Sequence, residues 1–215
     1  MTVVTGLVDA VSILSLGRVF VANMTGNIVF VAFALAGAPG FSLSASLFAL
    51  AGFLVGAAVG GVLITRVTGD RAALLRDGAA FELGLLAIAL GVVAAIGPHL
   101  DAAARNAVAA VLAMAMGMQN AVARRLAVPD LTTTVLTMTL TGIAADAPTT
   151  RRGAAFGRRL VAVATMFVGA LVGAALVLHD NIAVALGIAL GLIAVIAVAA
   201  FVSARQPSAW RLSQS

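Results

Sequence analysis

The sequence contains no cysteine, and charged residues of either sign are scarce. Only 10% of its 215 residues are charged, against roughly 25% in soluble domains. The absence of cysteine excludes disulfides, thiolate catalysis and cysteine metal sites. All 13 basic residues are arginine, and the formal net charge is +5. These arginines lie between apolar runs, where they set membrane orientation, so we expect no nucleic-acid partner.

Motifs for catalysis and nucleotide hydrolysis are also missing. The sequence has no G-x-S-x-G, no H-E-x-x-H and no G-x-x-x-x-G-K-[ST]. Its two histidines, His99 and His179, lie in separate predicted loops and make a poor metal site. We therefore expect no enzyme, no ATP-driven pump, no metal and no cofactor.

Apolar residues are abundant instead. Hydrophobic residues make up 62% of the chain, and the mean hydropathy is +1.15. Several uncharged runs reach the roughly 20 residues that a helix needs to cross a bilayer. The N-terminus lacks a basic region, so we expect no cleaved signal peptide. The chain is predicted to be an all-α polytopic membrane bundle with eight apolar segments, at residues 3–17, 19–37, 42–65, 79–97, 106–123, 131–145, 160–178 and 182–204.

Arginine positions predict the topology. Nine arginines lie in the loop before segment 79–97, the loop before segment 160–178, and the C-terminal tail, which are therefore predicted to be cytoplasmic. Segments 106–123 and 131–145 must then make one net crossing together, and 19–37 and 131–145 are predicted to be discontinuous or re-entrant. About six net crossings result, with both termini and the tail 205–215 in the cytoplasm.

An internal repeat is predicted within the single membrane domain 1–215. Residues 6–11 resemble residues 117–122 at an offset of 111, and residues 24–27 fall on 136–139 at an offset of 112. Gly52 and Gly56 fall on Gly169 and Gly173 at an offset of 117. Because equivalent loops lie on opposite predicted sides, repeats 1–97 and 104–204 have inverted topology, as in many transporters.

Three motifs, in order, are similar to those of a known family. Gly6-Leu7-Val8-Asp9-Ala10, the run from Val21 to Asn27 and Gly117-Met118-Gln119-Asn120-Ala121 resemble the YoaK-like family of bacterial inner-membrane proteins. One departure is that residues 136–139 lack the Gly-Asn pair of the first-half motif. The resemblance implies a bacterial inner-membrane location and about six helices, and the family is a domain of unknown function.

Asp9 is the first candidate site residue, because ionisable side chains are costly inside a membrane. The cost is about 2.5 to 3.5 kcal/mol at the bilayer centre. A carboxylate there suits proton transfer or cation binding. The alternative is an interfacial segment in which Asp9 only caps the helix start. In the predicted repeat, Asp9 falls on Asn120, a neutral analogue.

Other polar residues inside apolar segments complete the candidate substrate or ion site. Residues 23–27 favour a helix break whose free backbone groups face a cavity; the alternative is that these side chains only join neighbouring helices. The threonines follow one helical face at intervals of four residues, and could instead bond their own helix backbone. The full set is Asp9, Asn23, Thr25, Gly26, Asn27, Gln119, Asn120, Thr133, Thr137 and Thr141.

Two further patterns are interpreted as structural. Glycines four residues apart in segments 42–65, 160–178 and 182–204 predict close helix packing. Glu82 and Asp146 lie near predicted segment ends, where their side chains can reach the interface.

The sequence thus predicts a secondary transporter or channel for a small polar or anionic solute, with proton coupling as a hypothesis. The alternative function is a non-transporting membrane scaffold or assembly protein. The expected partners are membrane lipids and a small-molecule solute, and the glycine patterns would suit a homo-oligomer.

Overall fold

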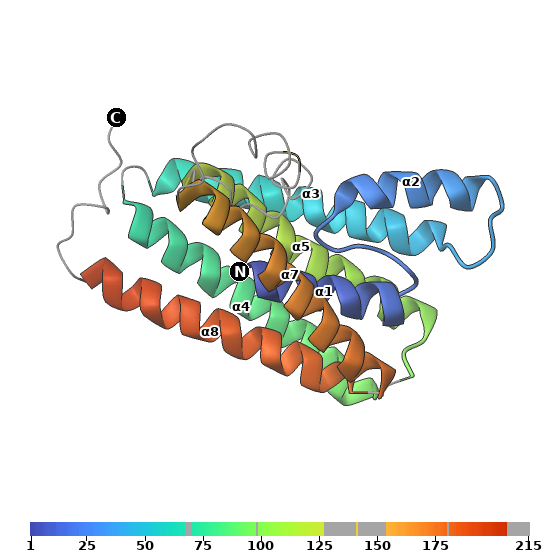
Figure 1. The fold of residues 1–215 in the computed structure, drawn as a ribbon. Helices are drawn as coiled ribbons and strands as arrows, with labels where there is room; N and C mark the ends of the chain where they lie inside the picture. The colour runs from blue at the N-terminus through green and yellow to red at the C-terminus, as the bar shows by residue number, and fades with distance from the viewer. Residues whose placement is uncertain (68–69, 98, 127–140, 142–153, 180, 206–215) are drawn as a thin grey trace.

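The computed structural model describes residues 1–67, 70–97, 99–126, 141, 154–179 and 181–205, and every regular element in these ranges is a helix. Five helices are long and apolar enough to cross a membrane. The chain is therefore an all-α polytopic membrane bundle, as predicted (Figure 1). The long helices are α3 (Leu43–Arg66), α4 (Arg71–Ile96), α5 (Ala102–Leu126), α7 (Ala154–Leu178) and α8 (Ile182–Arg205), and the short ones are α1 (Thr2–Ser15) and α2 (Met24–Leu35).

Side-chain caps extend two of the helices beyond the predicted apolar runs. The Asp70 carboxylate accepts hydrogen bonds from the amides of Ala72 and Ala73, so α4 begins eight residues before the run at 79–97. Asp101 likewise accepts from the amide of Ala104 at the start of α5. Hydropathy predicts the part of a helix that meets lipid, whereas capping residues set where the helix begins.

The arginine-bearing helix ends lie together at one end of the bundle. Arginine occurs in the last turns of α3, α5 and α8, in the first turn of α4 and in the second turn of α7. The directions of the helices bring these ends together (Figure 1). Helix α5 thus ends, and α7 begins, at the same end, as the predicted parity requires. That this end faces the cytoplasm stays a prediction.

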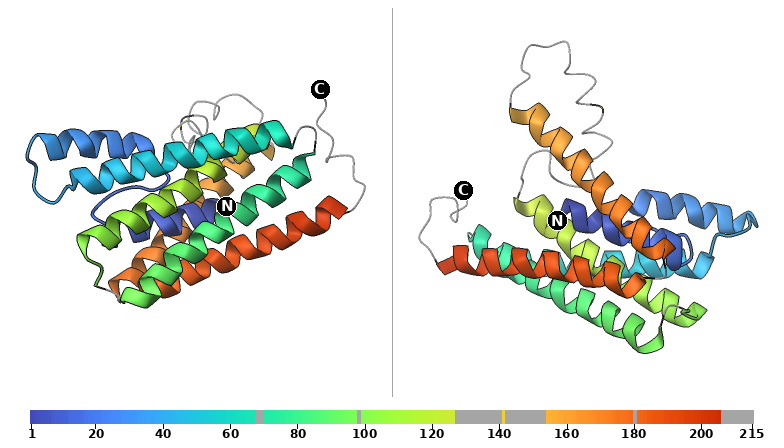
Figure 2. Two further views of the ribbon diagram at one scale, coloured as in Figure 1. Left: turned by 180° about the vertical axis from the view of Figure 1, so that it is seen from behind. Right: turned by 60° about the horizontal axis from the view of Figure 1, so that its bottom comes forward.

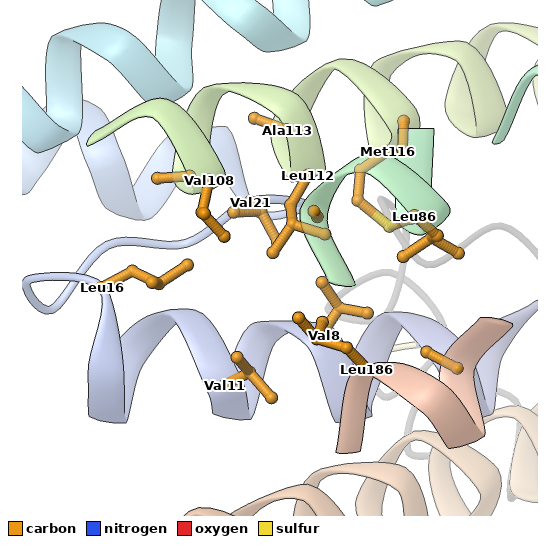
Figure 3. Packing of buried hydrophobic residues seen from close by; sticks show 14 of the residues in the cluster. Val8, Val11, Leu16, Val21, Leu86, Val108, Leu112, Ala113, Met116 and Leu186 are labelled. Carbon is orange, nitrogen blue, oxygen red and sulfur yellow. The ribbon is translucent and has the colours of Figure 1, made fainter. Parts of the chain in front are cut away.

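The short helix α1 lies in the interior of the bundle. It packs against α7, α8 and α5, and Val4, Leu7, Val8 and Val11 are at most 1% exposed. Figure 2 shows α1 enclosed by the longer helices, and Figure 3 shows Val8 and Val11 among side chains of the central core. The alternative that α1 is an interfacial helix is therefore wrong.

Two helix pairs meet through glycine in the same way. A Cβ atom on Gly6 of α1 would overlap the Met166 carbonyl oxygen of α7. A Cβ atom on Gly117 of α5 would overlap the Phe53 carbonyl oxygen of α3. Gly6 and Gly117 are 111 positions apart, and Phe53 and Met166 are 113 apart. At both interfaces, α1–α7 and α5–α3, a glycine thus faces a backbone carbonyl oxygen of the other helix.

The glycine contacts of α3 and α7 differ by one helical turn from the predicted pairing of these two helices. The backbone beside Gly56 is that of Met114, and the backbone beside Gly169 is that of Val3, which is 111 positions before Met114. Within a repeat, these contacts would pair Gly56 with Gly169, one turn from the predicted pairing of Gly52 with Gly169; the repeat itself stays a prediction.

The glycine pattern of α8 does not mark a packing surface in the described structure. A Cβ atom on Gly187 or Gly191 would meet nothing within 4 Å among the described residues. The prediction of close packing is confirmed for the glycines of α3 and α7, and is wrong for those of α8. Thr133, Thr137 and Asp146 lie outside the described residues, as does segment 131–145 apart from Thr141.

Candidate functional site

An unwound segment, residues 16–23, connects the two short helices. Gly17 (φ 98°) and Arg18 (φ 57°) both adopt left-handed backbone conformations directly after α1, and such turns suit glycine best. The chain turns back here before α2 begins at Met24 (Figure 1). The break was predicted within residues 23–27. It instead precedes them, because residues 24–27 form the first turn of α2.

Asp9 fixes the unwound segment from the middle of α1. Its Oδ1 atom accepts hydrogen bonds from the amides of Val21 and Ala22, both at 3.0 Å. The side chain is 5% exposed, and Oδ2 has no hydrogen-bond partner among the described residues. Asp9 therefore does not cap α1; it satisfies two backbone donors that the helix break would otherwise leave unpaired.

Asn27 performs the complementary task from the first turn of α2. Its Oδ1 accepts from the Phe20 amide at 2.8 Å, and its Nδ2 donates to the Phe20 carbonyl oxygen at 2.6 Å. Gly26 gives the Phe20 ring room, since a Cβ atom there would lie 2.6 Å from ring carbons. Three consecutive amides of the unwound segment are thus held by two buried side chains.

The remaining residues of the 23–27 motif point elsewhere. Asn23 and Thr25 are exposed on the bundle surface, and the Asn23 side chain makes no capping hydrogen bond to α2. Thr141 is exposed as well. Of the motif, only Gly26 and Asn27 contribute directly to holding the unwound segment.

A buried polar face runs along α1. Thr5, Asp9 and Ser12 are spaced at i, i+4 and i+7, and all three are buried. The Thr5 hydroxyl accepts a hydrogen bond from Nε2 of Gln119 at 3.0 Å, which connects α1 to α5. Sequence analysis missed Thr5 and Ser12, although their helical spacing from Asp9 was a usable signal.

Asn120 follows Gln119 in α5. It is half-buried, and its Nδ2 donates to the Met116 carbonyl oxygen of its own helix at 2.9 Å. The hydrogen bonds described for the Asp9 side chain come from the unwound segment. That Asn120 is the counterpart of Asp9 in a repeat stays a prediction.

A cavity of about 270 Å³ opens at the end of the bundle opposite the arginine-rich end. It adjoins the start of the unwound segment and the N-terminal ends of α3 and α5. Asn106 in its wall donates to the Ser44 hydroxyl at 3.1 Å. Sequence analysis did not identify this cavity, whose lining comes from three distant parts of the chain: Leu16, Gly17, Gly40, Phe41, Ser42, Ser44, Ala45, Ala102, Arg105 and Asn106.

Glu82 corrects another prediction. Its side chain was expected to reach the interface, but it is 0% exposed. Neither carboxylate oxygen has a hydrogen-bond partner among the described residues. Its position in the middle of α4, 11 residues after the helix begins, is too deep for the side chain to reach the helix end.

Comparisons with known proteins agree with this architecture. A family model described as "Protein of unknown function (DUF1275)" matches residues 1–199. The chain belongs to this family. It is also 31% identical, over 141 residues, to the UPF0700 transmembrane protein YoaK of Bacillus subtilis (strain 168). That match covers 66% of this chain and 61% of YoaK, less than two thirds of the relative's length.

No solved structure matches the chain. The DUF1275 family and its YoaK relative support a transmembrane protein, and neither description gives a substrate. The resemblance noted from the three sequence motifs is confirmed. Any chemistry assigned to this DUF1275 chain has to come from its own residues.

Proposed function

We propose that the chain is a secondary transporter or channel for a small polar or anionic solute. The observation that carries the proposal is that the cavity adjoins the helix break, since Leu16 and Gly17 belong to both. Transporters commonly bind solutes where discontinuous helices leave backbone groups free beside a cavity. The path we propose starts in the cavity and continues along the unwound segment.

The chemistry of the cavity wall favours an anion. Arg105 supplies a positive charge, and no acidic side chain is among the lining residues. The first turns of α3 and α5 add the partial positive charge of two helix N-termini. Ser42, Ser44 and Asn106 supply hydrogen-bonding groups. Together these groups suit a small solute with an anionic or strongly polar end.

Asp9 is the proposed link between protonation and the unwound segment. Its Oδ1 holds two amides of that segment, while Oδ2 has no partner among the described residues and is free to take a proton. Protonation would remove the negative charge that strengthens the two hydrogen bonds. We propose that proton uptake thereby loosens the unwound segment.

The equivalent glycine contacts support an inverted repeat as the basis of movement. Helices α1 and α7 meet through the same positions as α5 and α3. In transporters with inverted repeats, one half rocks against the other around a fixed site. Under this proposal the α1–α7 and α5–α3 interfaces move in turn, one as the path opens to one side of the membrane and the other as it opens to the opposite side.

The test is uptake into proteoliposomes from pools of small anions and polar metabolites, with internal pH recorded. We expect saturable flux in the wild type. Asp9→Asn should abolish proton-coupled flux while the protein stays folded, and Asn27→Ala should reduce flux by loosening the break. Arg105→Gln should weaken apparent affinity for an anionic solute, whereas Arg125→Gln, exposed at the opposite end, serves as its control.

Two results would redirect the assignment. Unchanged coupled flux in Asp9→Asn would remove Asp9 from the mechanism. No flux in a folded wild type, with no solute raising its melting temperature, would favour the non-transporting scaffold instead.

A further inference from the structure

Glu82 and Gln119 lie at the same level of the bundle on two neighbouring antiparallel helices. One turn from Glu82 toward the arginine-rich end, a Cβ atom on Gly78 would lie 2.8 Å from Cγ2 of Val122. One turn the other way, Leu86 and Met116 pack in the same core (Figure 3). On α4, Glu82 lies between Gly78 and Leu86. On α5, Gln119 lies between Val122 and Met116. The two polar side chains therefore occupy one buried level of the α4–α5 interface.

Hydrogen bonds on the other side of Gln119 fix the orientation of its amide. The Thr5 hydroxyl donates to the Met1 carbonyl oxygen at 3.3 Å, and a hydroxyl has only one hydrogen to donate. Toward Gln119 it therefore acts as acceptor, and takes the bond from Nε2 at 3.0 Å. The amide NH₂ faces Thr5, so Oε1 of Gln119 remains an acceptor without a donor among the described residues.

Three buried oxygens thus share this level, and the described residues offer none of them a hydrogen. These are Oε1 and Oε2 of Glu82 and Oε1 of Gln119. An ionised carboxylate in this place would be a buried charge without hydrogen bonds, which desolvation strongly disfavours. A proton on Glu82 turns one of its carboxyl oxygens into a hydrogen-bond donor, and the unpaired Oε1 of Gln119 can accept that bond.

We propose that Glu82 binds a proton and donates it in a hydrogen bond to Gln119 Oε1, forming a protonatable site separate from Asp9. A proton fits better than a metal ion, because hard cations such as Ca²⁺ or Mg²⁺ take about six or more oxygen ligands. The neighbouring core residues Leu86, Met116 and Val122 are apolar and buried. This site requires no solute, so its test is independent of the transport proposal.

Few charges face Glu82 from the elements packed on α4. The Met1 α-amino group interacts with it electrostatically, and among the described residues no ion pair involves Glu82. Asp9 lies on α1 and makes its hydrogen bonds to the unwound segment. The arginines of the helices packed on α4 are exposed near helix ends: Arg66 on α3, Arg105, Arg124 and Arg125 on α5, and Arg205 on α8.

The experiment uses the purified full chain in lipid nanodiscs, without any solute. Infrared spectra at neutral pH should show the carbonyl stretch of a protonated carboxylic acid, and Glu82→Gln should remove that band. The control is Asp101→Asn, which changes an exposed carboxylate at a helix cap and should leave the band in place. A spectrum that Glu82→Gln leaves unchanged means that Glu82 is ionised, and the proposal is wrong.

Thermal stability gives a second measurement on the same proteins. Raising the pH should lower the wild-type melting temperature as Glu82 loses its proton. Glu82→Gln, whose amide can still donate to Gln119, should show a smaller decrease in melting temperature as the pH rises. If sodium chloride raises the wild-type melting temperature relative to choline chloride, and Glu82→Gln removes the effect, the site binds a metal cation and the proposal is overturned.

A second variant keeps the test open if Glu82→Gln fails to fold. Gln119→Leu leaves the carboxyl group in place and removes its acceptor, so the acid band should shift to higher frequency. An acid band that does not move in this variant shows that Gln119 is not the acceptor, and that result would falsify the proposed pairing.

Discussion

Asn27 and the backbone of Phe20 are joined by two hydrogen bonds in opposite directions. Oδ1 accepts from the Phe20 amide at 2.8 Å, and Nδ2 donates to the Phe20 carbonyl oxygen at 2.6 Å. An amide side chain is the group that matches a backbone peptide in this way, because it offers one acceptor and a donor side by side. The pairing replaces bonds that a continuous helix would have made.

Asn27→Ala should therefore destabilise the protein, because it leaves a donor and an acceptor of Phe20 without partners. Each orphaned group costs about 1–3 kcal/mol. Asn27→Asp should also be less stable than the wild type, since it keeps the acceptor, loses the donor and places a buried carboxylate beside the Phe20 carbonyl oxygen. Unfolding in mixed micelles measures the difference. Asn23→Ala is the matched control, because the Asn23 side chain is exposed and caps nothing; an equal loss in both variants would contradict the pairing.

Asp9 gives a prediction that separates its structural role from its charge. Asp9→Asn keeps an acceptor for the amides of Val21 and Ala22, so it should fold with a loss of about 1 kcal/mol or less. Asp9→Ala leaves both amides unpaired and should cost about 2 kcal/mol or more. Melting temperatures in detergent test the order of the two variants. If Asp9→Ala is as stable as Asp9→Asn, the carboxylate does not hold the unwound segment.

The sequence allowed the fold class and most helices to be predicted, because membrane helices are recorded in local hydropathy. The run at 182–204 became α8 almost unchanged. The start of α4 could not be predicted from hydropathy, because the Asp70 cap and the charged residues Arg71, Arg76 and Asp77 of the first two turns lie outside the apolar run. Local composition predicts what lipid contacts, and says less about helix ends.

The candidate site was predictable only in part, since its contacts depend on distant pairings. Asp9 and Asn27 stand out as polar residues in apolar segments, and both are buried at the break. Both side chains bond to the backbone of residues 20–22, and the side chains of those residues give no indication of this pairing. Glu82 was misread because it lies near the start of the predicted segment 79–97, whereas α4 begins at Arg71 and places Glu82 well inside the helix. The cavity joins three remote segments that no local pattern connects.

Thr5 and Gln119 should be energetically coupled, because their hydrogen bond is the described side-chain bond between α1 and α5. Thr5→Val and Gln119→Leu each leave one partner unpaired, whereas the double variant removes both. We expect a coupling free energy of about 0.6 to 2 kcal/mol, the range seen for such bonds in membranes. A double-mutant cycle of unfolding free energies measures it. Strictly additive losses would show that the two side chains do not interact.

Gly6 and Gly117 should respond alike to alanine if the two helix interfaces are equivalent. At each position the added Cβ atom would overlap a backbone carbonyl oxygen of the facing helix, which cannot rotate away as a side chain can. Gly6→Ala and Gly117→Ala should therefore force α1 from α7 and α5 from α3, at a cost of about 1–3 kcal/mol or more each.

The control for both is Gly91→Ala in α4, where a Cβ atom would meet nothing within 4 Å among the described residues. That variant should be neutral or stabilising by about 0.5–1 kcal/mol, because alanine restricts the unfolded chain more than glycine does. Unfolding free energies of the three variants decide the matter. A large loss at Gly6 with none at Gly117 would mean that only one interface needs close backbone approach, and the structural equivalence of the two helix pairs would not extend to their energetics.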